Sequence, residues 1–413
     1  MSARVSALVV SFSLAIGFVG LLGTACAADK KEQPKVSEKV GKPLTAALDA
    51  AKNKQFDVAL AKTKEAEAEK KTPFEQFKIN ETLAFIYGSQ KKYTELATTY
   101  EKMLEAPQFL TPEQLQSYPK SIAQLYASTQ QNAKAIEYAK KLLQEKPNDT
   151  EMLAMLGQIY YNTKDNKGCL QTFSNAIAVA EKAGGKPAEA WLQFARTCAN
   201  SVGDDNAETQ AYEKLVRFYP KPDYWQAYLR RTSKEDRSSI ASFNWLRLMG
   251  DTGALKQADD YMTYAQQAIA EFGVPCEAVR VLEDGFNKKV LGVDEKVKAR
   301  HTNTLVKAKE AAQSDKARLS QLTSEAESDA TGQKNVDAGM IYFGCGQYDQ
   351  AIAQLDKGIK KGGAKEIANA KLALGIAQLR KGERDVARAT FKSVASDQVL
   401  GKVAAAWTVR SYN

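Results

Sequence analysis

Apolar side chains recur at spacings of three and four residues along most of the chain, which is the period of an amphipathic α-helix. In residues 150–182 the pattern runs from Leu153 to Tyr160, stops at a polar stretch, and resumes with Cys169 and Phe173. This predicts two antiparallel helices that pack through their apolar sides. A single hairpin of this kind cannot bury its apolar surface, so several hairpins must stack.

The same order of small and large residues recurs along the chain. Ala123 lies 34 residues before Gly157, and both are small positions at which a second helix can approach closely. The large residues Tyr126 and Tyr160 fill the gap to the next unit. Further units are marked by Ala84 and Tyr87, Ala195 and Cys198, Gly339 and Tyr342, and Gly375 and Phe391, with an alanine-rich unit between Ala46 and Ala66. Residues 403–409 are expected to form a helix that caps the open end of the stack.

These residues and their period resemble the tetratricopeptide repeat over roughly two thirds of the chain. The resemblance implies an all-α, right-handed α-solenoid of stacked helical hairpins, with a divergent middle and a long polar helical segment. The C-terminal part, with residues 346–351 and 394–407, is similar to a group of exported proteobacterial repeat proteins. Some members of that group are encoded beside TonB/ExbB-type energy-transduction components, which would make such components candidate partners.

The pattern divides the chain into six segments. They are a signal peptide (1–27), a flexible leader (28–41), an N-terminal repeat array (42–220), divergent helical-hairpin repeats (221–291), a long polar helical segment (292–332) and a C-terminal repeat pair with its capping helix (333–413). In the polar segment the apolar positions form one narrow stripe, which fits a long helix or a hairpin that projects from the solenoid.

The first 27 residues are typical of an export signal. Arg4 precedes an uncharged apolar stretch, and the small residues at 25–27 suit cleavage by a signal peptidase. We therefore expect a periplasmic or exported protein. Two alternatives stay open: a signal anchor that retains the apolar stretch in the membrane, and a lipoprotein acylated on Cys26, although Gly23 makes a poor lipidation motif.

Composition argues against catalysis. The chain has a single histidine, His301, which we expect on a solvated helix surface. Zinc sites with several histidines are therefore excluded, and a serine–histidine triad would have to use this one residue or be absent. The formal net charge is +9. Lysine and glutamate are mixed along the chain, which is typical of a solvated surface. We expect no cofactor, no metal site and no nucleic-acid partner; an enzyme that uses the irregular middle is the remaining alternative.

Four cysteines follow the signal segment, and their spacings fit no metal or redox motif. Cys169 and Cys198 occupy positions where the repeat needs a small buried residue, so they are either packed thiols or a disulfide between adjacent hairpins. A bridge between Cys276 and Cys345 is less expected, because the long polar segment lies between them in the sequence.

The resemblance also implies a concave groove lined by the first helix of each hairpin. The predicted protein-binding groove residues are Glu81, Phe85, Lys120, Gln124, Gln158, Tyr161, Arg196 and Asn200. A mixed polar and aromatic groove suits an extended segment or a helix of another protein, although each residue could equally be an ordinary solvated one. Residues 217–225 interleave basic and aromatic side chains; either they form a stacking surface or, as we expect, the aromatic residues pack inside the next repeat.

Overall fold

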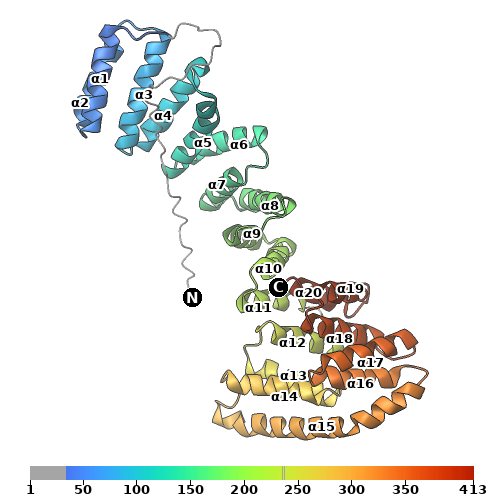
Figure 1. Cartoon of the computed structure of the whole chain (residues 1–413). Helices are drawn as coiled ribbons and strands as arrows, with labels where there is room; N and C mark the ends of the chain where they lie inside the picture. Colours follow the sequence, from blue (N-terminus) through green and yellow to red (C-terminus); the bar gives the residue numbers. More distant parts are fainter. Residues whose placement is uncertain (1–33, 235, 237) are drawn as a thin grey trace. The chain divides into compact units, whose positions relative to one another are not determined.

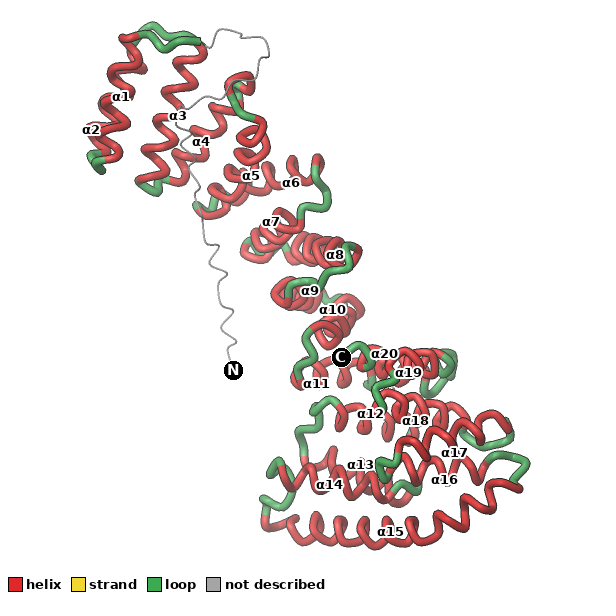
Figure 2. Tube along the Cα trace, viewed as in Figure 1, coloured by secondary structure: helices red, strands yellow, loops and turns green. Residues whose placement is uncertain are grey.

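The computed structural model describes residues 34–234, 236 and 238–413, and all regular structure in this part of the chain is helical (Figure 2). The helices form two compact units, the first ending at Leu115 and the second beginning at Gln116. Most successive helices run antiparallel as hairpins (Figure 1). The predicted all-α architecture of stacked helical hairpins is confirmed. Within the described residues, none of the helices has the length and hydrophobicity that a membrane span requires.

The first unit contains α1 (Glu38–Lys52), α2 (Phe56–Ala68), α3 (Pro73–Ser89), α4 (Tyr93–Leu104) and the 3₁₀ turn η1 (Pro107–Phe109). Its helix α1 corrects the predicted flexible leader of residues 28–41, because the helix begins at Glu38. Val40 is fully buried against Ala66 and Ile79, so the leader ends four residues earlier than expected. Gly41 and Pro43 hid this start, since neither residue is typical of a helix interior. Residues 1–33, which include the predicted signal peptide, lie outside the described residues.

The second unit holds the remaining helices. They are α5 (Pro112–Ser128), which begins just before the boundary, α6 (Asn132–Glu145), α7 (Thr150–Asn162), α8 (Asn166–Lys182), α9 (Glu189–Val202), α10 (Asp205–Phe218), α11 (Pro222–Thr232), α12 (Ser239–Asp251), α13 (Ala258–Ala270), α14 (Pro275–Asn287), α15 (Glu295–Ser328), α16 (Gln333–Gly344), α17 (Tyr348–Lys361), α18 (Ile367–Arg380), α19 (Arg384–Lys392) and α20 (Gly401–Arg410).

A close approach between a small and a large residue recurs within the hairpins. A Cβ atom added to Gly157 on α7 would lie 2.8 Å from the ring of Phe173 on α8, and one added to Gly375 on α18 would lie 2.5 Å from the ring of Phe391 on α19. Real Cβ contacts are longer than this, so only glycine lets these two helices approach so closely. The predicted role of the small residue is therefore observed, with the large partner 16 residues later in each hairpin.

The turns within the hairpins also share one conformation. The residue that reverses the chain has a positive φ, at Lys54, Lys91, Gln130 and Lys164 in the first four hairpins and at Gly203 in the next. This left-handed conformation favours glycine, and the four side chains that adopt it store a small conformational strain. Packing of the two helices outweighs this local cost. The turns therefore form without glycine or proline at these four positions, and a sequence pattern based on those residues does not predict them.

The long polar segment is one helix, α15, of 34 residues. Its predicted stripe, which includes Ala308, Ala312 and Leu319, is buried against α14 and α16, so the segment does not project from the unit as a hairpin. His301 corrects another expectation. Its side chain is only 5 % exposed, and Nδ1 accepts a hydrogen bond from the backbone N–H of Gly292 at 3.2 Å. The chain turns back over the start of α15 at Gly292 and thereby covers the imidazole.

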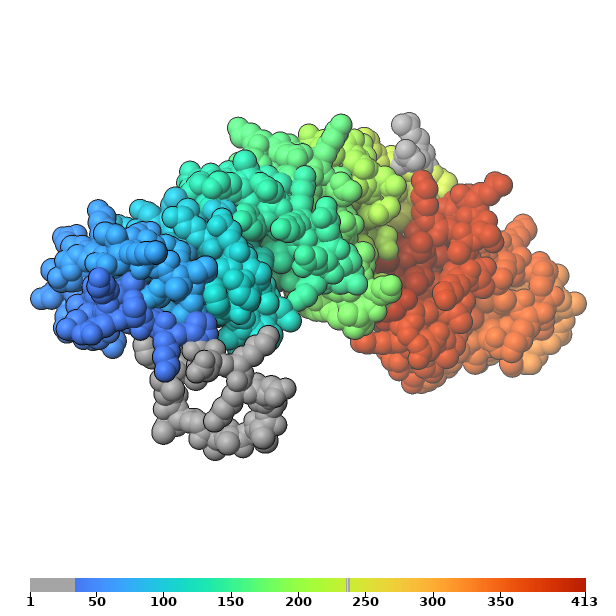
Figure 3. Space-filling view, turned by 90° about the horizontal axis from the view of Figure 1, so that it is seen from above, coloured from blue at the N-terminus to red at the C-terminus, as the bar shows by residue number. Residues whose placement is uncertain are grey.

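The last helix returns to the middle of the second unit, as Figures 1 and 3 show. Arg410 Nε on α20 donates to Asp251 Oδ2 at the end of α12 over 2.7 Å, and Arg380 of α18 pairs with the same buried carboxylate. Asn413 Nδ2 donates to the carbonyl oxygen of Val216 on α10 over 3.0 Å. Helix α20 covers α19, as the predicted cap does, but it also joins α10 and α12. The helices from α11 to α20 therefore close on themselves around one apolar core.

Glu75 holds the starts of two helices in the first unit. Its Oε1 accepts hydrogen bonds from the backbone N–H and the hydroxyl of Ser37, which precedes α1, at 2.8 and 2.6 Å. Its Oε2 accepts from the backbone N–H of Thr72, the N-cap of α3, at 2.7 Å. The Ser37 hydroxyl, followed by the two backbone N–H groups, lowers the pKa of Glu75 from 4.5 to about 2.

This carboxylate predicts acid-sensitive stability in the first unit. Because the pKa of Glu75 is lower in the folded state, its contribution is complete above pH 4.5 and disappears as the pH falls toward about 2. We expect Glu75→Gln to lower the unfolding temperature at pH 7 and to differ progressively less from the parent protein below pH 4.5. Circular dichroism melts across this range measure the effect. A difference that is independent of pH would contradict it.

Candidate functional site

The first helices of four consecutive hairpins lie along one side of the second unit. In Figure 1, α5, α7, α9 and α11 follow one another on this side, and α6, α8 and α10 lie on the other. We use the name first-helix surface for the exposed and half-buried polar side chains of α5, α7 and α9. Six of the predicted groove residues belong to it, namely Lys120, Gln124, Gln158, Tyr161, Arg196 and Asn200. Asn200 is exposed and the other five are half-buried.

Between α5 and α7, the predicted residues converge on one carboxylate. Lys120 Nζ lies 2.5 Å from Glu151 Oε2, and Gln124 Nε2 donates to Glu151 Oε1 over 3.4 Å. Glu151 was not among the predicted groove residues, although the same repeat count places it at a groove-facing position, two residues before Leu153. The pair is solvent-accessible, so it adds little to stability and mainly fixes the spacing of the two helices.

Between α7 and α9, one predicted residue is free to interact and another is engaged in packing. Gln158 Nε2 donates to Asn162 Oδ1 over 3.0 Å on the same helix, so its carbonyl oxygen is available to a partner. The ring of Tyr161 packs edge-on against Phe194 with 4.9 Å between centroids. Phe194 in turn stacks on Phe173 at 5.1 Å. Tyr161 therefore extends the core between hairpins as well as lining the surface.

Arg196 and Asn200 are engaged with the second helix of their own hairpin. The Arg196 guanidinium lies 5.6 Å from the ring centroid of Tyr212 on α10. Asn200 Nδ2 donates to Glu208 Oε2 over 3.2 Å, and Glu208 also pairs with Arg231 of α11. These two predicted residues join α9 to α10, so they offer less to a partner than Gln124 and Gln158 do.

Glu81 and Phe85 belong to α3 of the first unit. Glu81 Oε2 pairs with Lys78 Nζ at 2.6 Å, one turn away on the same helix. Phe85 packs beside a small apolar cluster that includes Ala50, Ala59 and Ile86. Phe85 is therefore largely a packing residue, and the periodicity alone could not distinguish it from a surface position.

A second carboxylate network, between α9 and α11, was missed. Glu189 Oε1 accepts from Lys221 Nζ at 2.5 Å and from the Tyr224 hydroxyl at 2.6 Å, and Gln193 Nε2 donates to that hydroxyl oxygen at 2.6 Å. The hydrogen bond from Lys221, followed by that from Tyr224, lowers the pKa of Glu189. Glu189 lies in the first turn of its helix, as Glu151 does. Charges on this surface are thus largely neutralised by neighbouring helices.

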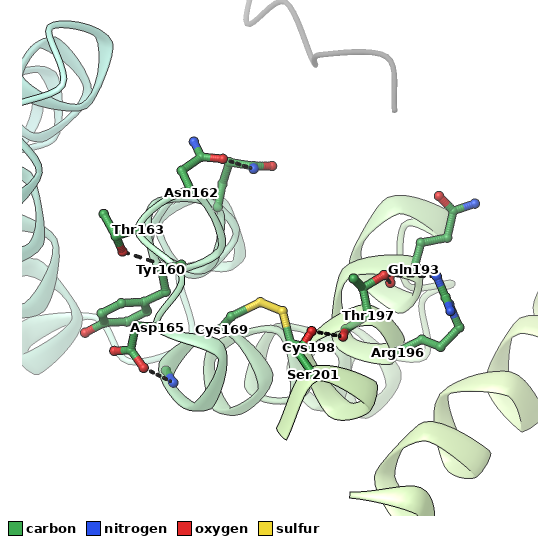
Figure 4. The surroundings of a disulfide bond; sticks show 12 residues. Tyr160, Asn162, Thr163, Asp165, Cys169, Gln193, Arg196, Thr197, Cys198 and Ser201 are labelled. Carbon is green, nitrogen blue, oxygen red and sulfur yellow. Dashed lines mark hydrogen bonds between the residues drawn. A yellow bond between two sulfur atoms is a disulfide. The ribbon is translucent and has the colours of Figure 1, made fainter. Parts of the chain in front are cut away.

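Both candidate cysteine pairs are disulfides. Cys169 on α8 is joined to Cys198 on α9 with 6.1 Å between Cα atoms, so adjacent hairpins are cross-linked; Figure 4 shows Gln193 and Arg196 on the side of α9 away from this bond. Cys276 at the start of α14 is joined to Cys345 after α16, with 4.8 Å between Cα atoms. The expectation against this second bridge was wrong, because α15 runs back along α14 and returns the chain to its starting point.

The disulfides predict four protected thiols and a loss of stability on their removal. Denatured protein is expected to release four additional thiols only after reduction, measured by thiol titration. The double variants Cys169→Ala/Cys198→Ala and Cys276→Ala/Cys345→Ala should each lower the free energy of unfolding by about 2–4 kcal/mol, and the second by more because it closes the longer loop. Four thiols titrating without reductant would contradict both expectations.

A charged cluster in the closed part of the second unit was not predicted from the sequence either. Arg247 on α12 makes two hydrogen bonds of 2.8 Å to Glu277 on α14, and the Tyr264 hydroxyl donates to Glu277 over 2.6 Å. The Arg247 guanidinium also lies 4.4 Å from the ring centroid of Phe243. Burial disfavours the Glu277 carboxylate, but Arg247 outweighs it and lowers the pKa of Glu277. Burial raises the pKa of Tyr264 well above its usual range.

This cluster joins helices rather than binding a substrate, because Arg247 and Glu277 are almost completely buried. Glu277→Gln should cost about 3–5 kcal/mol of unfolding free energy, since the guanidinium stays buried without its counter-charge. The matched control is Glu283→Gln on the same helix, whose exposed pair with Lys309 should be worth at most about 1 kcal/mol. Equal effects of the two variants in urea unfolding would contradict this role.

In the part of the chain that the structure describes, no three histidine, cysteine or acidic side chains gather as metal ligands. The first-helix surface instead consists of amides, an arginine, an aromatic ring and carboxylates paired with lysines, which form hydrogen bonds and van der Waals contacts. Groups of this kind can bind another molecule through hydrogen bonds.

Residues 121–149, which span the end of α5, all of α6 and the loop before α7, match the tetratricopeptide repeat family. This one segment of the chain is therefore similar to a single tetratricopeptide repeat. A comparison with curated protein sequences finds no match. The matched repeat contains the small residues Ala123 and Ala135, both fully buried as in the predicted pattern. It also supplies Gln124 to the first-helix surface.

Solved structures resemble the chain only distantly. A tetratricopeptide repeat protein from Parabacteroides merdae is 14% identical, with 91% of this chain and 100% of that chain covered and a TM-score of 0.30. The TPR2AB domain from yeast in complex with pHSP90 is 13% identical, with coverages of 72% and 97% and a TM-score of 0.23. A Rap protein complexed with Competence and Sporulation Factor is 14% identical, with coverages of 89% and 89% and a TM-score of 0.24.

Proposed function

We propose that this protein is a non-enzymatic scaffold that binds another protein through the first-helix surface of α5, α7 and α9. The observation that carries the proposal is the row of half-buried and exposed amide side chains, Gln124, Gln158 and Gln193, on helices that hairpin packing holds at fixed spacing. Amide groups donate and accept hydrogen bonds, so they suit a polypeptide partner. The matched tetratricopeptide repeat supports a role in protein–protein interaction.

The same surface favours a protein over a small molecule. Its polar groups are distributed over three helices instead of converging in one cavity, and few of its charges lack a neighbour of opposite sign. A small ligand needs a concave pocket that buries most of its surface, whereas a protein can use many separate contacts. The rigid helices reduce the conformational entropy lost on binding.

We further propose that the protein acts outside the cytosol, in the periplasm. The signal-like pattern of residues 1–27 and two disulfides support this, because disulfides persist in oxidising compartments. Anchoring through an acylated Cys26 is the alternative, with a role in outer-membrane or cell-wall assembly. Mass spectrometry of the mature N-terminus distinguishes the two: a free Ala28 excludes lipidation. The resemblance of the C-terminal part makes components of TonB/ExbB-type systems the first envelope partners to test.

The binding surface is tested by matched glutamine substitutions. Gln124→Glu/Gln158→Glu changes the first-helix surface, and Gln171→Glu/Gln210→Glu makes the same change at exposed positions of α8 and α10. In crosslinked pull-downs from the envelope fraction, the first variant should lose at least about tenfold in partner recovery and the second should match the parent protein. Circular dichroism checks that both fold. Equal recovery by both variants would exclude this surface.

A further inference from the structure

The basic and aromatic stretch of residues 217–225 divides in the structure. Trp225 is buried in the core of the closed part, as expected. Arg217, at the end of α10, is instead exposed and lies over the ring of Tyr412, 4.4 Å from its centroid. Arg388 of α19 lies over the same ring at 4.9 Å. We name Arg217, Arg388 and Tyr412 the arginine–tyrosine cluster; Figure 1 shows α10 and the end of the chain beside each other.

The cluster is held in place by contacts of the residues that precede and follow Tyr412 in the chain. The preceding residue, Ser411, accepts a hydrogen bond at its carbonyl oxygen from Arg388 Nη1 over 3.3 Å. The following residue, Asn413, is bonded to Val216 of α10, and Arg410 is paired with Asp251. Residues far apart in the sequence are therefore fixed around one ring before any partner arrives, and 45% of the Tyr412 surface stays exposed.

The charge of the cluster is incompletely balanced. Arg388 pairs with Asp385, whose side chain is almost fully exposed, but Arg217 has no carboxylate within ion-pair distance among the described residues. A guanidinium that lies over an aromatic ring leaves its N–H edge open, and this edge matches the two oxygens of a carboxylate. Arginine and tyrosine are also the residues that most often contribute strongly to protein interfaces.

We propose that the arginine–tyrosine cluster binds an acidic segment of a partner protein, with carboxylates on the guanidinium edge of Arg217 and an apolar part of the segment on Tyr412. This surface is distinct from the first-helix surface, because it is built from α10, α19 and the residues after α20. The exposed Asp385 beside Arg388 repels a dense array of phosphates, so sparse carboxylates fit better than a nucleic acid or an anionic membrane.

The test uses the purified protein and a short fluorescent peptide in which glutamate alternates with serine and leucine, read by fluorescence anisotropy. Arg217→Gln should weaken binding at least about fivefold, whereas the matched variant Arg300→Gln, which removes an exposed charge from α15, should change it less than about twofold. Binding should also weaken as salt rises from about 50 to about 300 mM. A peptide with glutamine in place of glutamate should not bind.

Two further variants separate the role of the ring from folding. Tyr412→Ala should reduce binding and Tyr412→Phe should restore it, because the hydroxyl group takes no part in the stacking. Equal weakening by Arg217→Gln and Arg300→Gln would reveal attraction to net charge alone and overturn the proposal. Equal binding of the glutamine and glutamate peptides would also overturn it. So would an Arg217→Gln variant that loses binding to phosphatidylglycerol vesicles but binds the glutamate peptide as the parent protein does. None of these outcomes bears on the first-helix surface.

Discussion

The close contact between a small residue of one helix and a large residue of the next is the constraint on which the rest of the structure depends. Where Gly157 meets Phe173 and Gly375 meets Phe391, the helices approach more closely than any side chain would allow. That approach buries an apolar strip which neither helix could hide alone. Close packing on one side of each helix also determines which residues lie on its other side. Gln124, Gln158 and Gln193 therefore follow one another along the first-helix surface.

Local spacing carries the information for these hairpins, so the all-α stack, the long polar helix and the burial of Trp225 could be predicted from the sequence. The closed part could not. Asn244 Nδ2 donates to Asn369 Oδ1 across 125 residues, and Arg410 reaches Asp251 across 159. Contacts of this kind depend on the number of hairpins between the two residues and on the angle between successive hairpins. A repeat pattern in the sequence does not specify that angle. The same reason explains why the bridge from Cys276 to Cys345 was unexpected.

The candidate site shows a finer limit. Counting repeat positions selected Lys120 and Gln124, which lie on α5, and the same count could have added Glu151. It could not foresee that Arg196 and Asn200 turn toward α10, because their partners Tyr212 and Glu208 lie in the second helix of the hairpin. Phe85 was predicted to line the groove but packs beside an apolar cluster, because an aromatic residue at the edge of a helix can be partly buried and partly exposed. Spacing identifies a face of a helix, whereas the direction of a long side chain depends on its neighbours.

The return of α20 to α10 and α12 has an evolutionary consequence. Repeat proteins lengthen and shorten by duplicating or deleting whole hairpins. Before α10, such a change would lengthen or shorten the array without disturbing the contacts between α12 and α20. Between α12 and α20 it would displace Arg410 from Asp251. The contact between α12 and α20 would then be lost, because it requires a fixed number of helices between them. Relatives of this protein should accordingly vary in length upstream of α10 and keep a constant count downstream.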